Sequence, residues 1–239
     1  MAARSPGRYS APRGPAVVPD DDTGPAHRAA RAAAVIKRGI GNLILRLSGW
    51  AFEGTVPATR RYVLIAAPHT SNWDFVYMMA MAWSLGQRLH WMGKASLFAP
   101  PHGWFFRALG GLPVRRDAPG SLVEQSALHF AQAQDLVLAV PAEGTRRRRT
   151  HWRSGFYHIA RLAEVPIVLG YLDYARKRGG LGPAVRPSGD VRADMDRVRA
   201  FYADKVGRYP ADFTPPRLVE EDAEPAMQAG AQEPRVTSA

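Results

Sequence analysis

Two polar clusters hold the residue types that could do chemistry. His69 and Asp74 stand five residues apart, directly after the apolar stretch 62–67. The run 143–146, which reads Glu-Gly-Thr-Arg, follows a second apolar stretch, 136–140. An imidazole takes up a proton near neutral pH, and a carboxylate beside it fixes the tautomer and stabilises the imidazolium. If both stretches are strands of one sheet, their ends could form a single site.

Each cluster also has an ordinary structural interpretation. Asp74 could be a first-turn helix residue and His69 a loop histidine, because a His and an Asp at this spacing recur by chance. Gly144 could simply supply an unusual backbone angle where a strand ends. On the functional interpretation, Arg146 presents a planar fork to a phosphate and Glu143 orients that fork or the acceptor. The residues alone leave both interpretations open.

Composition narrows the classes of partner. The chain has 239 residues, is 46% apolar and carries a formal net charge of +11. It is therefore expected to form one globular domain with anionic partners: nucleic acid, anionic lipid headgroups or phosphorylated substrates. The chain has no cysteine, which excludes disulfides and thiolate catalysis. No apolar run reaches the roughly 18 residues that span a bilayer, and no secretory signal is evident, so we expect a cytoplasmic protein that can lie on a membrane.

The domain is expected to occupy residues 27–214. Residues 1–26 and 215–239 are predicted to be disordered tails, because their Pro-rich and small-residue composition buries little apolar surface. Residues 27–51 are predicted to form an amphipathic helix, with one face made of Ile36, Ile40, Leu43, Ile44, Leu47 and Trp50. That face could pack on the domain core or lie in a membrane interface with its arginines on anionic headgroups.

Strand and helix patterns then alternate along the chain. Strands are predicted at 62–67, 90–92, 112–114, 136–140 and 167–172. Helices are predicted at 74–85, 104–109, 121–134, 155–163 and 190–207. The expected fold is therefore α/β, with a mainly parallel sheet covered by helices on both faces and preceded by the amphipathic N-terminal helix.

Four ordered motifs carry a resemblance to a known family. They are His69-x4-Asp74, Gly93-Lys94 with Leu97-Phe98, Glu143-Gly144-Thr145-Arg146, and Val165-Pro166-Ile167-Val168. In this order they resemble the four blocks of the glycerolipid acyltransferases, and most closely those of the bacterial 1-acyl-glycerol-3-phosphate acyltransferases. The resemblance covers roughly residues 30–175.

The resemblance implies transfer of a fatty acyl group from coenzyme A or acyl carrier protein to a lysophospholipid hydroxyl. His69 would be the general base and Asp74 would orient it, while Lys94 and Arg146 would hold the acceptor phosphate. The supporting turn would be Glu143, Gly144 and Thr145. No metal and no cofactor is expected beyond the thioester co-substrate. The expected partners are membrane lipids and the lysophospholipid, with acyl carrier protein as one possible donor, at the cytoplasmic face of the membrane.

Departures from the family pattern keep alternatives open. Ala142 stands between Pro141 and Glu143, where the family usually has proline directly before the glutamate. Arg115 replaces an acidic residue of the second block, so the acceptor could be another lysophospholipid or a lipidated amino acid. A catalytically inactive lipid-binding descendant is a further alternative. A more remote one is a basic nucleic-acid-binding module, in which Arg146–Arg149 contact phosphates and Trp152 stacks on a base.

Overall fold

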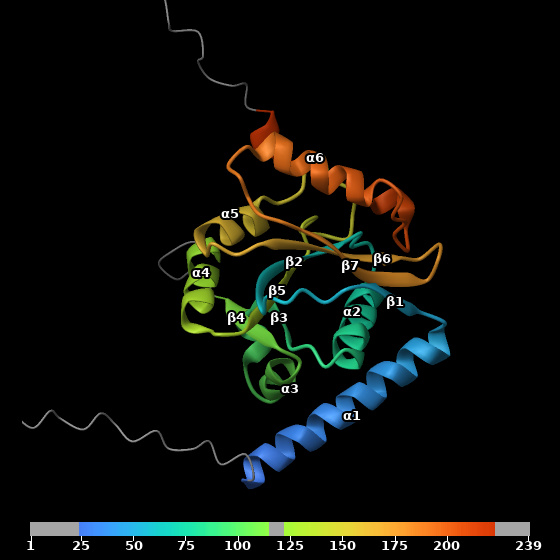
Figure 1. The fold of residues 1–239 in the computed structure, drawn as a ribbon, viewed down its shortest axis with the longest axis vertical. Coiled ribbons are helices and arrows are strands. Elements are labelled where there is room, and N and C mark those ends of the chain that lie inside the picture. Colours follow the sequence, from blue (N-terminus) through green and yellow to red (C-terminus); the bar gives the residue numbers. More distant parts are fainter. Residues whose placement is uncertain (1–23, 115–121, 223–239) are drawn as a thin grey trace, which may run out of the picture.

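A seven-stranded sheet with the order β1-β7-β6-β2-β5-β3-β4 runs through the centre of the molecule (Figure 1). The computed structural model describes residues 24–114 and 122–222. The strands are β1 (Ala51–Gly54), β2 (Arg61–Ala67), β3 (Leu89–Lys94), β4 (Gly111–Val114), β5 (Leu136–Val140), β6 (Ile167–Asp173) and β7 (Arg178–Val185). Strands β6, β2, β5, β3 and β4 are mutually parallel, whereas β7 is antiparallel to β6 and parallel to β1. The predicted mainly parallel α/β fold is confirmed.

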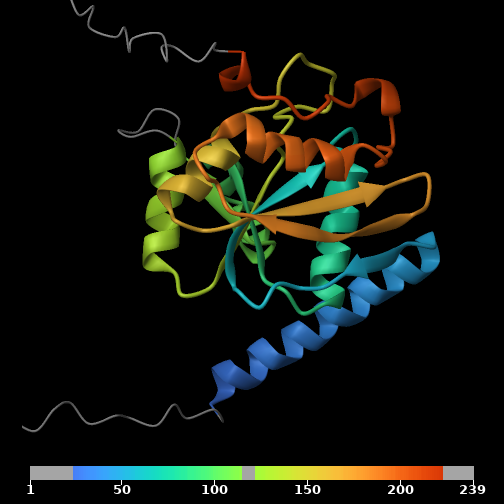
Figure 2. The same ribbon diagram turned by 45° about the horizontal axis from the view of Figure 1, so that its top comes forward.

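Helices lie on both sides of this sheet. They are α1 (Pro25–Ser48), α2 (Trp73–Ser84), α3 (Gly103–Ala108), α4 (Leu122–Gln132), α5 (Gly155–Leu162) and α6 (Val191–Tyr202), with 3-10 turns η1 (Ala95–Phe98), η2 (Pro210–Asp212) and η3 (Val219–Glu221). Figures 1 and 2 show α2 on one face of the sheet and α5 and α6 on the other, with α1 on the outer side of α2. All six helices were predicted, and their ends shift by only a few residues, except that α6 stops five residues before the predicted end at 207.

Strand β2 is fixed in place because both of its faces are buried. Tyr62 and Leu64 pack in the core beneath α2, whereas Val63 and Ile65 pack in the core beneath α5 and α6. Each fully buried aliphatic side chain stabilises the fold by about 1.5–3 kcal/mol, so a one-residue slip of β2 would cost several of these contributions. The end of β2 is therefore a rigid platform for the turn that follows it.

Helix α1 packs mainly on α2. A Cβ on Gly41 would lie 2.5 Å from the backbone oxygen of Ala80, so only glycine permits this close crossing. The predicted apolar face is divided: Trp50 is buried and Ile44 partly buried, while four residues of that face are exposed, namely Ile36, Ile40, Leu43 and Leu47. Within the described parts of the chain, no helix is long and apolar enough to span a membrane.

The packed structure continues past residue 214, where a disordered tail was predicted to begin. Residues 203–222, here called the C-terminal strap, follow α6 and cross the side of the molecule opposite α1 (Figure 2). Leu218 is fully buried in the main core, and Arg199 pairs with Glu221 at 2.6 Å. The prediction was wrong because this apolar anchor and the charge pairing depend on residues distant in sequence. Residues 1–23 of the predicted tail 1–26, Arg115 and residues 223–239 lie outside the described residues, whereas Pro25 already begins α1.

Candidate active site

His69 and Asp74 meet in the turn between β2 and α2. Their Nδ1 and Oδ2 atoms are 3.3 Å apart, and their side chains are 20% and 6% exposed. The same Oδ2 accepts hydrogen bonds from the backbone N–H groups of Thr70 and Ser71, each at 2.8 Å. The turn thus folds Asp74 back onto His69, which is the juxtaposition that the sequence spacing predicted.

Glu143 supports this turn from underneath. Its side chain is fully buried, with Oε1 accepting a hydrogen bond from the backbone N–H of His69 and Oε2 accepting one from Thr214 at 3.0 Å. Burial raises the pKa of Glu143 to about 7, although the two backbone donors oppose the rise. Glu143 therefore contacts backbone and acts on the site through His69.

A cavity of about 880 Å³ opens beside His69 and Asp74, and Lys94 and Arg153 also line it. Its walls are mostly apolar and come from the sheet and from α2, α4 and α5. They include Leu64, Phe75, Met78, Met81, Leu85, Leu89 and Trp91. The volume lies in the upper part of the range for small-ligand pockets, and charged groups gather with the His69–Asp74 pair among an apolar lining. Such a cavity suits a molecule with an anionic head and a long apolar tail.

The structure does not bring Arg146 into this cavity. Arg146 is exposed and is not among the lining residues, and Thr145 beside it is half-buried. Gly144 does line the cavity, with φ +68°, and a Cβ there would lie 2.7 Å from the side chain of Arg153. Arg153 therefore occupies the place beside the cavity that Arg146 was expected to take. No local signal distinguished it from the neighbouring arginines.

Sequence reasoning also missed Tyr174. Its hydroxyl donates to Oδ1 of Asp74 at 2.6 Å, across 100 residues of chain. The one available signal was position, since Tyr174 follows the predicted strand 167–172 and the carboxyl ends of parallel strands meet at one edge.

Trp152 is not available to stack on a nucleic-acid base. Its side chain is buried, and its indole N–H donates to the backbone oxygen of Thr214 at 2.7 Å. This removes the aromatic ring on which the nucleic-acid alternative depended.

The arrangement suits general base catalysis. A neutral His69 can keep its Nδ1 proton toward Asp74, which leaves Nε2 as the nitrogen available to accept a proton. Because His69 lines the cavity, a hydroxyl bound there could be activated as a nucleophile.

Comparison with known proteins agrees with this geometry. A sequence model of the Acyltransferase family matches residues 51–169, which include β1 to β5 and both polar clusters. Among solved structures, the chain is similar to the 1-acyl-sn-glycerophosphate acyltransferase PlsC of Thermotoga maritima, with a TM-score of 0.55 and 15% identity over 75% of this chain and 82% of that one. No curated protein matches the chain significantly. The ordered motifs, the match of residues 51–169 to the Acyltransferase family model and the fold shared with PlsC all support the assignment of this chain to the glycerolipid acyltransferases.

Proposed function

We propose that this protein transfers a fatty acyl group from a thioester carrier to the free hydroxyl of 1-acyl-glycerol-3-phosphate, with His69 as the general base. The observation that carries the proposal is the His69–Asp74 pair on the wall of a large, mainly apolar cavity that also has two cationic side chains. The carrier is coenzyme A or acyl carrier protein, and the product is phosphatidic acid.

The proposed reaction needs one proton transfer in each direction. His69 Nε2 takes the proton of the acceptor hydroxyl as its oxygen attacks the thioester carbonyl carbon. The tetrahedral intermediate collapses with cleavage of the C–S bond, and the imidazolium returns the proton to the departing thiolate. Asp74 stabilises the positive charge that His69 carries between these steps.

Cationic side chains at the cavity support an acceptor with a phosphate group. Lys94, at the end of β3, and Arg153, just before α5, both line the cavity. We propose that they contact the phosphate directly, and that Arg146 attracts it from the exposed rim. Arginine can form two parallel hydrogen bonds to a phosphate, which suits Arg153 to the orienting role.

The exposed side of α1 supports peripheral membrane binding. Ile36, Ile40, Leu43 and Leu47 recur at helical spacing and are each at least 43% exposed. Solvent-exposed apolar side chains in a row, on a chain with a net charge of +11, fit an anionic lipid surface such as the cytoplasmic leaflet. A lysophospholipid acceptor would be reached from that surface.

Vesicle sedimentation tests this membrane contact. Leu43→Ser with Leu47→Ser should weaken binding to anionic vesicles by more than about tenfold, because each leucine contributes about 1.5–3 kcal/mol when buried. Leu128→Ser, on exposed α4 surface across the sheet from α1, is the matched control. Equal binding by the double variant and the control would contradict the role of α1.

An acyl-transfer assay tests the reaction itself. Purified protein is mixed with labelled long-chain acyl-CoA or acyl carrier protein and a panel of lysophospholipids and lipidated amino acids, with His69→Ala alongside. Product from 1-acyl-glycerol-3-phosphate that disappears in the variant is the expected result. Product only from another acceptor would move the assignment to that substrate, and no product from any pair would reject the proposed activity.

A further inference from the structure

Asp74 uses both of its carboxylate oxygens. Oδ2 accepts the backbone N–H groups of Thr70 and Ser71 and faces Nδ1 of His69. Oδ1 accepts the hydroxyl of Tyr174 at 2.6 Å. The first three groups all come from the predicted catalytic motif, whereas Tyr174 comes from the turn between β6 and β7, beyond the residues that match the family.

Tyr174 can act only as a donor to Asp74. Burial, followed by the hydrogen bond to Asp74 and its charge, raises the pKa of the Tyr174 hydroxyl well above its ordinary value. The phenol therefore keeps its proton in the neutral pH range. Since it donates that proton to Oδ1, it draws negative charge toward the side of the carboxylate that faces away from His69.

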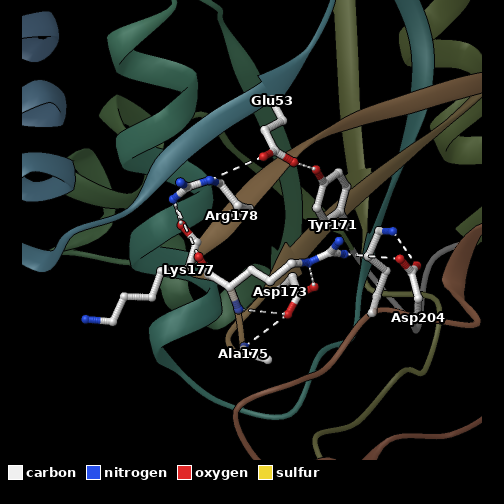
Figure 3. A network of polar contacts seen from close by, with 9 residues as sticks. Glu53, Tyr171, Asp173, Ala175, Lys177, Arg178 and Asp204 are labelled. Carbon is white, nitrogen blue, oxygen red and sulfur yellow. Dashed lines mark hydrogen bonds and ion pairs between the residues drawn. The ribbon is translucent and has the colours of Figure 1, made fainter.

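The turn that carries Tyr174 is strongly braced (Figure 3). Buried Asp173 accepts the backbone N–H groups of Ala175 and Arg176, and its other oxygen accepts Nε of Arg176 at 2.7 Å. Arg176 also reaches Asp204 of the C-terminal strap at 3.2 Å. The backbone N–H of Tyr174 itself donates to the oxygen of Val206 at 2.8 Å. These bonds fix the turn independently of Asp74.

Aromatic contacts fix the ring of Tyr174. Trp50 meets it edge-on with a centroid distance of 4.9 Å, and Tyr77 meets it at 6.1 Å. The guanidinium of Arg208 lies 5.9 Å from the ring centroid. With its backbone and ring both held, Tyr174 cannot follow Asp74 if the carboxylate rotates, so its hydroxyl defines where Oδ1 must lie.

The geometry points to Tyr174 as a positioning residue that holds the carboxylate of Asp74 in register with His69 and moderates its pull on the imidazolium. This inference rests on the proposed function, in which His69 accepts and returns a proton. Among the described residues, other ionisable or charged groups near the pair are Glu143 under the His69 backbone, Tyr77 and Arg208 beside Tyr174, and Lys94 and Arg153 along the cavity.

The test is Tyr174→Phe, which keeps the ring and removes the hydroxyl. Tyr77→Phe is the matched control, because that hydroxyl belongs to the same aromatic group and makes no described hydrogen bond to Asp74. Acyl transfer is measured against pH, and the imidazole of His69 is titrated by NMR, with His69→Ala identifying its resonance. The titration needs no turnover and so remains informative if the proposed reaction is wrong.

In Tyr174→Phe we expect kcat to fall about tenfold with little change in acceptor KM, since one hydrogen bond to a charged group is lost. The acid limb of kcat/KM and the NMR titration of the His69 imidazole should both move to higher pH, because the negative charge of Asp74 is no longer shared with the phenol. In an Asp74→Asn background the substitution should have no further effect.

The possible outcomes separate the two proposals. A shifted NMR midpoint without any acyl transfer would retain the positioning role and reject the reaction. Activity with an unmoved midpoint and an unmoved acid limb would overturn the positioning role, as would equal effects of Tyr174→Phe and Tyr77→Phe. Additive losses of Tyr174→Phe and Asp74→Asn would also overturn it.

Discussion

The turn that carries His69 and the arginine run 146–149 follow neighbouring parallel strands, yet they are held very differently. In the first, the backbone N–H groups of His69, Thr70 and Ser71 all donate to buried carboxylates. In the second, every arginine is exposed, and one described hydrogen bond, from Arg149 N–H to Thr214, holds the backbone. Two segments at the same edge of one sheet thus differ in rigidity.

The difference matches what each segment would do. Proton transfer requires atoms within hydrogen-bond reach, so a misplacement of about 1 Å can cost about 10²-fold in rate. Attraction between a cation and a phosphate falls off slowly with distance and tolerates movement. The rigid turn therefore suits catalysis, and the exposed run suits capture of anionic molecules before they enter the cavity.

The largest difference between the two segments is expected when Asp74, in the rigid turn, is replaced. Asp74→Asn should lower kcat about 10³-fold, because an amide no longer stabilises the imidazolium and can favour the wrong His69 tautomer. Steady-state acyl transfer measures this, with circular dichroism to check folding. Asp135→Asn, an exposed carboxylate paired with Arg60, is the control and should be silent. A loss of less than about threefold would remove Asp74 from the mechanism.

The rigidity of the turn can be tested at Glu143 through pH. Its folded pKa of about 7 lies above its ordinary value of 4.5, so the folded state binds the extra proton between these values. The contribution of Glu143 to the free energy of unfolding should therefore be greatest below pH 4.5. It should fall by up to about 3 kcal/mol as the pH rises to 7.

Glu143→Gln should remove this fall, because an amide does not titrate. It should also destabilise the protein by about 1–3 kcal/mol, since only one of its two terminal atoms can accept an N–H from His69 or Thr214. Urea denaturation at several pH values measures both effects. A variant whose stability falls with pH as steeply as the parent's would show that Glu143 is not the titrating group.

Kinetics can separate the roles of Arg153, which lines the cavity, and Arg146, which does not. Arg153→Ala should raise acceptor KM about tenfold, because Arg153 lines the cavity, whereas Arg146→Ala should raise it only about twofold. Comparison of KM and kcat for both variants is the measurement. If Arg146→Ala has the larger effect, the phosphate is bound outside the cavity described here.

The smallest effect on catalysis is expected within the exposed arginine run. Arg147→Ala with Arg148→Ala should leave kcat unchanged on a micellar acceptor and weaken binding to anionic vesicles about tenfold at low salt. The difference should vanish at high ionic strength, because exposed charges are screened beyond about 8 Å already at physiological salt. A salt-independent loss would mean that these arginines make fixed contacts.

The elements predicted from sequence are those whose signals are local. Strands β2 and β5 are continuous apolar runs, and each helix has its own apolar period. Strand β7 was not predicted, because its sequence contains Gly179, Gly180, Gly182 and a proline, which oppose strand formation. Gly180 is nevertheless required there, since a Cβ would lie 1.9 Å from the backbone oxygen of Glu53 in β1. Pairing with a distant strand overrode the local preference.

The same distinction applies to the site. His69 and Asp74 were predictable because one short turn brings them together. Tyr174 and Thr214 reach the site from 100 and 71 residues away, through the sheet order and the path of the strap. The choice between Arg146 and Arg153 depends on how the chain curls after Gly144, which no periodic pattern records.

The bond between Glu143 and Thr214 has a consequence for synthesis of the protein. Thr214 is made 71 residues after Glu143, a delay of roughly 4–14 s at about 5–20 residues per second. During that time the sheet strands up to β7 can pair, but one oxygen of Glu143 lacks its partner and the His69 turn lacks its full support. The turn of a nascent chain is therefore fully supported only after Thr214 has left the ribosome, well after the strands that flank the site have been made.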